Sequence, residues 1–216
     1  MLKNIEKIEI KLKSIYAYEF AKEFGPNAYI DSGLFIDNLK YDKIIEKVEE
    51  QKKRRLPHEP YLKHFVEELD TVLPIWAYID LFSIHDVSTL YSISADCLKN
   101  KVAEAMGLTI KGDKILSCYL HSLTIIRNLC AHGNRLYNRI FEQKPSLNSR
   151  EKKNLIVKKD GIIDNEHLYG FMFILKRLLS LDDFNKMKHD IVGLTLKYPF
   201  VNMKYYGFRT DWKTII

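Results

Sequence analysis

The chain has 216 residues, of which 46% are hydrophobic and 29% charged, and its formal net charge is +6. This composition is typical of a globular protein that buries a core, and it excludes a disordered chain and a membrane-spanning segment. Three cysteines are too few for a disulfide framework, and we expect no signal peptide, so we expect a cytoplasmic protein. The excess of basic residues fits a polyanionic partner such as RNA, and it fits a surface of solvated lysines equally well.

The first half of the chain is predicted to be helical, because glycine and proline are few and apolar residues recur every three or four positions. The predicted helices cover residues 2–22, 33–54 and 61–70. Gly25 breaks the first helix, and a basic run at 51–55 ends the second. Pro74 begins an apolar segment that continues to Phe82, and we expect this segment to form a central buried helix.

The second half is predicted to be helical as well, with one long polar interruption. The predicted helices cover residues 94–107, 113–131, 165–180 and 182–197. Asp113 is the expected N-cap of the longest helix, and Gly133 is its expected stop. Residues 142–163 are polar, and we expect a loop there that is basic enough to touch RNA. Trp212 is expected to anchor an aromatic tail, so that residues 1–216 form one all-α domain.

The informative segment is the predicted helix that ends near Gly133. On a helical wheel, its apolar arc of about 120° holds Leu116, Tyr119, Leu120, Leu123, Ile126 and Cys130. Arg127 falls inside this arc, whereas Asn128 and His132 share a different face. An unpaired buried arginine costs several kcal/mol. Arg127 therefore pairs with a carboxylate, extends its guanidinium to water, or faces a cavity or partner subunit where it meets phosphate; the sequence leaves these open.

Arg127 and His132 form an Arg-x4-His pair, a spacing that arises readily by chance, but its surroundings make it specific. The segment IRNLCAHGNRLYNR (126–139) resembles the motif of bacterial abortive-infection (Abi) proteins of the AbiD/AbiF type, in the HEPN superfamily. Residues 24–29, 65–90 and 207–212 resemble further elements of that family, in the same order. Arg209 stands where the family's last element has a proline. Such proteins usually carry a further N-terminal region, so we expect a short or truncated member.

The resemblance implies a HEPN-like helical bundle and a metal-independent endoribonuclease that acts as a toxin in phage defence. It makes Arg127, Asn128 and His132 the catalytic residues, with no metal and no cofactor. Histidine can transfer a proton near neutral pH, and an arginine can hold the phosphate and stabilise its developing charge. The residues expected to contact RNA are Asn134, Arg135, Asn138, Arg139 and His121.

The wheel separates Arg127 from His132 by about 140° if the helix is regular. Either the helix ends early and turns His132 round, or two copies of the motif meet across a two-fold axis. The resemblance implies the second arrangement, a homodimer with a composite active site. A small RNA or a protein would be the antitoxin.

Two alternatives come from other classes of protein. A zinc site at Cys118, His121, Cys130 and His132 is disfavoured, because one continuous helix holds His121 and Cys130 too far apart for a single ion. A non-catalytic RNA-binding or interaction module, truncated or held by a partner, remains the alternative to a ribonuclease. Trp76 is an aromatic residue that could stack on a base, although we expect it in the core.

Overall fold

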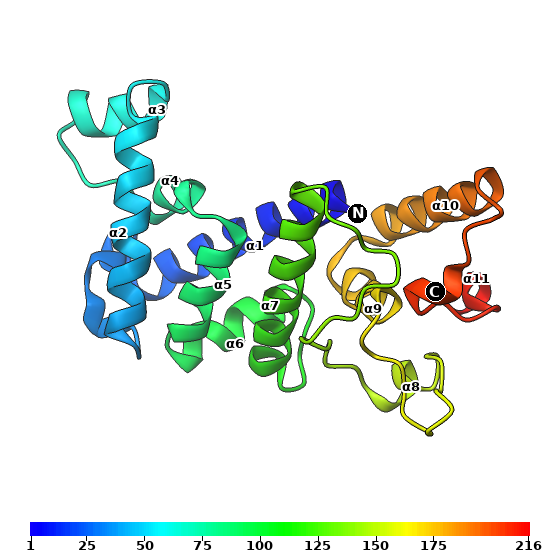
Figure 1. Ribbon diagram of the computed structural model, residues 1–216. Coiled ribbons are helices and arrows are strands. Elements are labelled where there is room, and N and C mark those ends of the chain that lie inside the picture. The colour runs from blue at the N-terminus through cyan, green and yellow to red at the C-terminus, as the bar shows by residue number, and fades with distance from the viewer. The chain divides into compact units, whose positions relative to one another are not determined.

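The structure is a computed structural model that describes all 216 residues, and it confirms the all-α fold (Figure 1). The helices are α1 (Leu2–Phe24), α2 (Asn38–Arg55), α3 (Pro60–Lys63), α4 (Ile75–Tyr78), α5 (Ile84–Ile93), α6 (Asp96–Ala105), α7 (Gly112–Ala131), α8 (Ser149–Lys152), α9 (Leu168–Leu178), α10 (Leu181–Lys197) and α11 (Trp212–Ile215). There is no β-strand, only two isolated bridges. Every helix is either too short or too polar to span a lipid bilayer.

The chain divides into two compact units. The terminal unit consists of Met1–Ile8 and Cys118–Ile216, and the central unit consists of Glu9–Ser117. Helices α1 and α7 each contribute residues to both units. The expectation of one domain over residues 1–216 stays a prediction.

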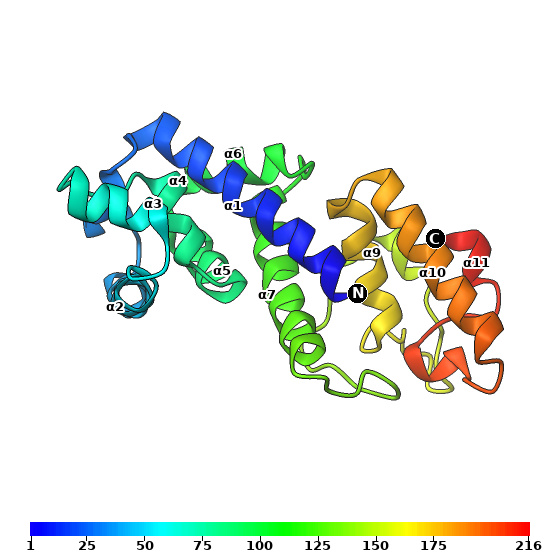
Figure 2. The same ribbon diagram turned by 90° about the horizontal axis from the view of Figure 1, so that it is seen from above.

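In the central unit, α2 packs against α5 (Figures 1 and 2). Helix α2 begins at residue 38 rather than near 33, because the Asp37 side chain accepts a hydrogen bond from the amide of Lys40 and caps the helix. Lys47 of α2 lies 2.6 Å from Asp86 of α5. Asp86 also closes a capping box with Ser83, so one buried carboxylate both starts α5 and joins it to α2.

The apolar segment 75–82 is not the single buried helix that its composition predicts. It forms the short helix α4 followed by one 3-10 turn over Ile79–Leu81. Tyr78 and Ile79 are buried, but Trp76 is 58% exposed. The segment therefore covers the core with one face and presents its largest side chain to solvent.

In the terminal unit, α9 is buried along its whole length apart from Lys176 and Arg177, and it packs against α10 (Figure 2). Trp212 is 3% exposed, and its ring meets that of Phe208, with centroids 5.0 Å apart. The expectation that Trp212 anchors the tail is confirmed.

Residues 142–163 do not form a plain loop, since they contain α8 and a bridge between Val157 and Ile163. Asn148 and Glu151 form a capping box that starts α8. Glu151 also accepts a hydrogen bond from Nε of Arg177 on α9, over 2.7 Å. This basic segment is thus held against the buried helix of the terminal unit.

Candidate functional site

The candidate catalytic residues lie on and just after the part of α7 that belongs to the terminal unit. The buried face of this helix is the one that the helical wheel predicts. Leu120, Leu123 and Ile126 are at most 1% exposed. The helix begins one residue before Asp113, which therefore lies in the first turn rather than at the N-cap. Cys130 is only half-buried, and burial raises the pKa of its thiol, so it is a packing residue and no reactive thiolate.

Helix α7 ends in a Schellman motif at the glycine that the sequence indicates. Gly133 adopts a φ of +64°, and its amide donates to the carbonyl oxygen of Cys130 over 3.2 Å. The amide of Asn134 donates to the carbonyl oxygen of Leu129 over 2.8 Å. These are the two hydrogen bonds that define the motif, and they make His132 the last residue before the chain turns.

His132 stays in register with the helix up to its own amide, which donates to the carbonyl oxygen of Asn128 over 3.1 Å. The helix therefore does not unwind before His132, and about 140° of rotation still separates its Cα–Cβ direction from that of Arg127. Both Asn128 and His132 are exposed. No hydrogen bond joins the side chains of Arg127 and His132, so a single copy does not bring these two groups together.

Arg127 is half-buried, and its Nε is fully buried without a hydrogen-bond partner. No ion pair joins it to a carboxylate, which removes one of the three explanations for an arginine in an apolar arc. An unsatisfied buried donor is uncommon and calls for a reason, such as a ligand that the group binds. Of the remaining explanations, extension to water and a contact with phosphate are both consistent with this geometry.

The residues expected to contact RNA are all exposed. They are His121 on α7, and Asn134, Arg135, Asn138 and Arg139 after it. Neither arginine of this set forms an ion pair, so both positive charges are free to meet a phosphate. They extend from the same turn that ends α7 at His132.

The turn after Gly133 is braced by the C-terminal tail, a contact that sequence reasoning missed. Asn138 has a φ of +52°, and its amide donates to the carbonyl oxygen of Tyr205 over 3.0 Å. The Tyr137 ring lies against the rings of Tyr205 and Tyr206, at centroid distances of 5.4 and 5.2 Å. No local pattern predicts this cluster, because nearly seventy residues separate Tyr137 from its partners.

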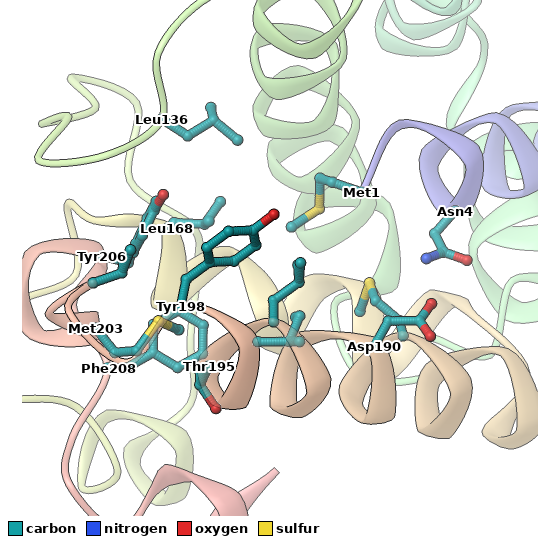
Figure 3. Close-up of a pocket in the computed structure, with 14 residues that line it drawn as sticks. Met1, Asn4, Leu136, Leu168, Asp190, Thr195, Tyr198, Met203, Tyr206 and Phe208 are labelled. Atoms are coloured by element: carbon teal, nitrogen blue, oxygen red, sulfur yellow. The ribbon is translucent and has the colours of Figure 1, made fainter.

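A cavity of about 340 Å³ is lined by Leu136 of the same turn. Leu136 and Tyr206 lie at one end of it, and Asn4 and Asp190 lie at the other (Figure 3). Its remaining lining is mostly aliphatic side chains and methionines from α9, α10 and the tail. Because Asp190 is the only charged side chain of the lining and the rest is mostly apolar, the cavity does not suit a phosphate.

One group of side chains in the terminal unit has the composition of a metal site. Asp164, Glu166 and His167 place their ligand atoms within 4.8 Å of one another. The ammonium groups of Lys158 and Lys144 bind Glu166 and hold the pKa of its carboxyl below the usual range. The two lysine ammonium groups already balance the negative charge of Glu166. The 2.6 Å contact between His167 and Asp164 is explained as a buried polar pair.

Comparison with known proteins gives a match to one family. The family model described as Abi-like protein matches residues 1–138, which include α7, its terminal turn and the Arg-x4-His pair. No curated protein and no solved structure matches the chain.

Proposed function

We propose that this chain, which belongs to the Abi-like protein family, is a metal-independent endoribonuclease with a HEPN-like site of the AbiD/AbiF type. Membership of the family is consistent with a role in abortive-infection defence against phage. The observation that carries the proposal is the buried Nε of Arg127, which has no protein partner and lies within one and a half helical turns of the exposed Asn128 and His132.

The proposed reaction uses the RNA's own 2′-hydroxyl as the nucleophile. Its oxygen forms a bond to the adjacent phosphorus while the bond from phosphorus to the 5′-oxygen breaks. A neutral His132 takes the proton from the 2′-hydroxyl, and a protonated imidazole gives one to the departing 5′-oxygen. The products are a 2′,3′-cyclic phosphate and a 5′-hydroxyl end. Arg127 stabilises the charge that develops on the phosphate, and Asn128 orients it.

The active site is proposed to be composite, formed by two copies of the chain across a two-fold axis. One regular helix directs Arg127 and His132 about 140° apart, whereas an isologous contact along α7 would bring the arginine of one copy to the histidine of the other. Two histidines would then face one cleft and supply the acid and the base. The exposed Arg135 and Arg139 would add positive charge around it.

The test is incubation of a labelled RNA with the full chain in EDTA. The native protein should cleave it and leave cyclic-phosphate and 5′-hydroxyl ends, and Arg127→Ala and His132→Ala should each abolish cleavage. His189→Ala is the matched control, because His189 is an exposed histidine of α10 that has no proposed role in binding or chemistry. Cleavage that vanishes on chelation, or that survives in His132→Ala, would contradict the proposal. A protein that stays monomeric at every active concentration would contradict the composite site.

A second candidate is a non-catalytic RNA-binding module, kept in a complex with a small RNA or a protein antitoxin. It is favoured by the exposed, unpaired Arg135 and Arg139, which form a binding surface whether or not His132 acts on the RNA. Binding of RNA that is strongly salt-dependent, with no cleavage product after long incubation, would select this candidate.

A further inference from the structure

The central unit carries an open groove of about 800 Å³ that has no role in the proposed chemistry. Its floor is one stripe of α1 that includes the small residues Ser14, Ala17 and Ala21. Trp76 of α4 and Tyr18 of α1 line it, and they are 58% and 64% exposed. Exposed tryptophan is unusual in a protein surface that has no partner, because its large ring is normally buried.

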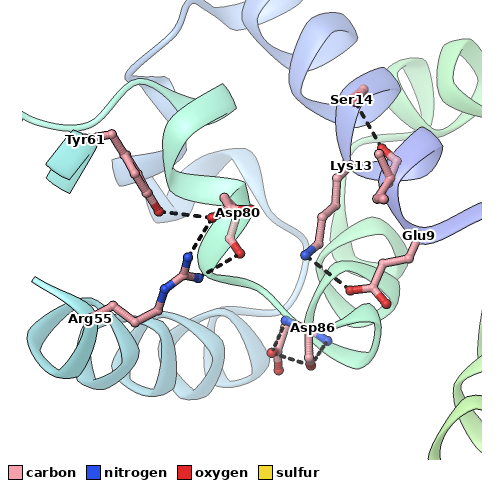
Figure 4. A network of polar contacts seen from close by, with 9 residues as sticks. Glu9, Lys13, Ser14, Arg55, Tyr61, Asp80 and Asp86 are labelled. Atoms are coloured by element: carbon pink, nitrogen blue, oxygen red, sulfur yellow. Dashed lines mark hydrogen bonds and ion pairs between the residues drawn. The ribbon is translucent and has the colours of Figure 1, made fainter. Parts of the chain in front are cut away.

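Positive charge accompanies these rings. Lys22 lines the groove without an ion-pair partner, and its Nζ lies 5.9 Å from the centroid of the Tyr18 ring. Lys13 also lines the groove, and it is held 3.2 Å from Glu9 (Figure 4).

The acidic residue of the groove is already paired with an arginine, Arg55, which also binds Glu59 over 3.1 Å. Asp80 receives hydrogen bonds from Arg55 over 2.9 Å and from the Tyr61 hydroxyl over 3.1 Å (Figure 4). Arg55 is the last residue of α2, so this contact brings the basic end of α2 to the edge of the groove. Lys53 and Arg54, just before it, are exposed and form no ion pair. The unpaired positive charge at the groove and its edge therefore comes from Lys22, Lys53 and Arg54, next to the two exposed rings.

We propose that this groove binds a single-stranded segment of RNA, with bases stacked on Trp76 and Tyr18 and phosphates held by Lys22 and the basic end of α2. Exposed aromatic rings interleaved with cations bind unpaired bases of any sequence, since every base has a stacking face. Duplex RNA would not bind there, because its bases are already stacked and paired. The inference rests on the proposed function in taking RNA as the ligand, and it adds a binding site in a different unit from the Arg-x4-His pair.

The unpaired positive charge of Lys22 favours a single-stranded RNA over an apolar peptide as the ligand of the groove. A helix docked on a floor of small residues would bury the ammonium of Lys22 and leave it without a counter-ion. The phosphates of RNA supply that counter-ion, and a base offers a flat apolar surface to the two rings. The groove thus suits a ligand that is flat, apolar and anionic at once.

The experiment uses the full chain with His132→Ala, so that the probe stays intact. A twelve-nucleotide oligo(A) RNA is titrated while tryptophan emission is followed. The chain has two tryptophans, and Trp212 is 3% exposed, so quenching reports on Trp76. We expect quenching that weakens as salt is raised, and no quenching by a twelve-base-pair RNA duplex.

Affinity is then measured by the anisotropy of a labelled oligo(A) on further variants. Trp76→Leu and Tyr18→Leu should each weaken binding by roughly fivefold to a hundredfold, with Trp76→Phe close to the parent. Phe200→Leu is the matched control, because Phe200 is an aromatic residue of the terminal unit that is 82% exposed. Unchanged affinity in both groove variants, or equal binding of the duplex, would overturn the proposal.

The ribonuclease proposal and the groove proposal can be contradicted independently of each other. If Trp76→Leu weakens RNA binding but the native chain never cleaves RNA, the groove stands and the ribonuclease does not. If the native chain cleaves RNA and Trp76→Leu binds and cleaves as the native chain does, the ribonuclease stands and the groove does not.

Discussion

The backbone amide of Asn134 reaches back across the end of α7 to the carbonyl oxygen of Leu129, 2.8 Å away. This hydrogen bond spans the turn that contains His132 and Gly133, and it can form only because Gly133 has a positive φ. The position of the candidate catalytic histidine is therefore set by backbone geometry rather than by a side-chain contact.

Gly133→Ala should lower the free energy of unfolding by about 1 kcal/mol, because an L side chain is strained at a φ of +64°. It should also slow RNA cleavage, since relief of that strain moves His132. Gly193→Ala is the control: Gly193 lies inside α10 with open space around it, so alanine there should stabilise the protein. Urea unfolding and a cleavage assay check both variants. Equal stability of the two would contradict the assignment of the turn.

Arg127→Met should raise the free energy of unfolding by about 1 kcal/mol while it abolishes cleavage, because it removes a buried donor that has no partner. Arg177→Met should lower the free energy of unfolding, since it leaves Glu151 without the partner that it binds at 2.7 Å. Urea titrations of the two variants measure the contrast. A large loss of stability in Arg127→Met would mean that Arg127 has a structural role.

Acid should destabilise the central unit through Asp86. Burial alone would raise the pKa of this carboxyl, but hydrogen bonds from Lys47 and Ser83 outweigh it, so the pKa lies below the ordinary 3.8. The folded state thus binds the proton less tightly than the unfolded state. The stabilisation is present above about pH 4 and is lost as the pH falls through the pKa of the folded state. Asp86→Asn should reduce this loss in urea titrations from pH 6 to 3, whereas the exposed Asp42→Asn should leave it unchanged.

Glu151→Ala should release the basic segment 142–163, because one carboxylate both closes the capping box of α8 and binds Arg177. Limited proteolysis with trypsin should then cut faster after Lys152 and Lys153. Glu142→Ala changes an exposed glutamate of the same segment that forms no ion pair, and it should be cut at the native rate. Equal rates in the two variants would show that the ion pair does not hold the segment.

Local signals predict the parts of this fold that depend on neighbours in sequence. The apolar arc of α7 and its stop at Gly133 follow from spacing and from one glycine, and the structure confirms both. Helix α5 was not predicted as a separate element, although Ser83 and Asp86 carry the spacing of a capping box. Its start could have been found from that pair.

The features that could not be predicted depend on contacts between segments that are far apart in the sequence. Composition cannot say which face of segment 75–82 meets the core, so it could not place Trp76 at the surface. Nor can a sequence show that Tyr137 meets Tyr205, since their contact depends on the path of the chain between them. For the candidate site, the sequence predicts which residues lie on α7 but not that Arg127 lacks a carboxylate partner, because partners come from distant segments.

The last turn of the segment that matches the family depends on contacts with residues outside that segment. The family match stops at residue 138, and the amide of that residue is bonded to Tyr205. A transplant of residues 1–138 into another protein would leave Tyr137 without its two aromatic neighbours and the last turn without its brace. The matched segment is therefore not self-contained, because the shape of its last turn depends on a tail that lies beyond the matched residues.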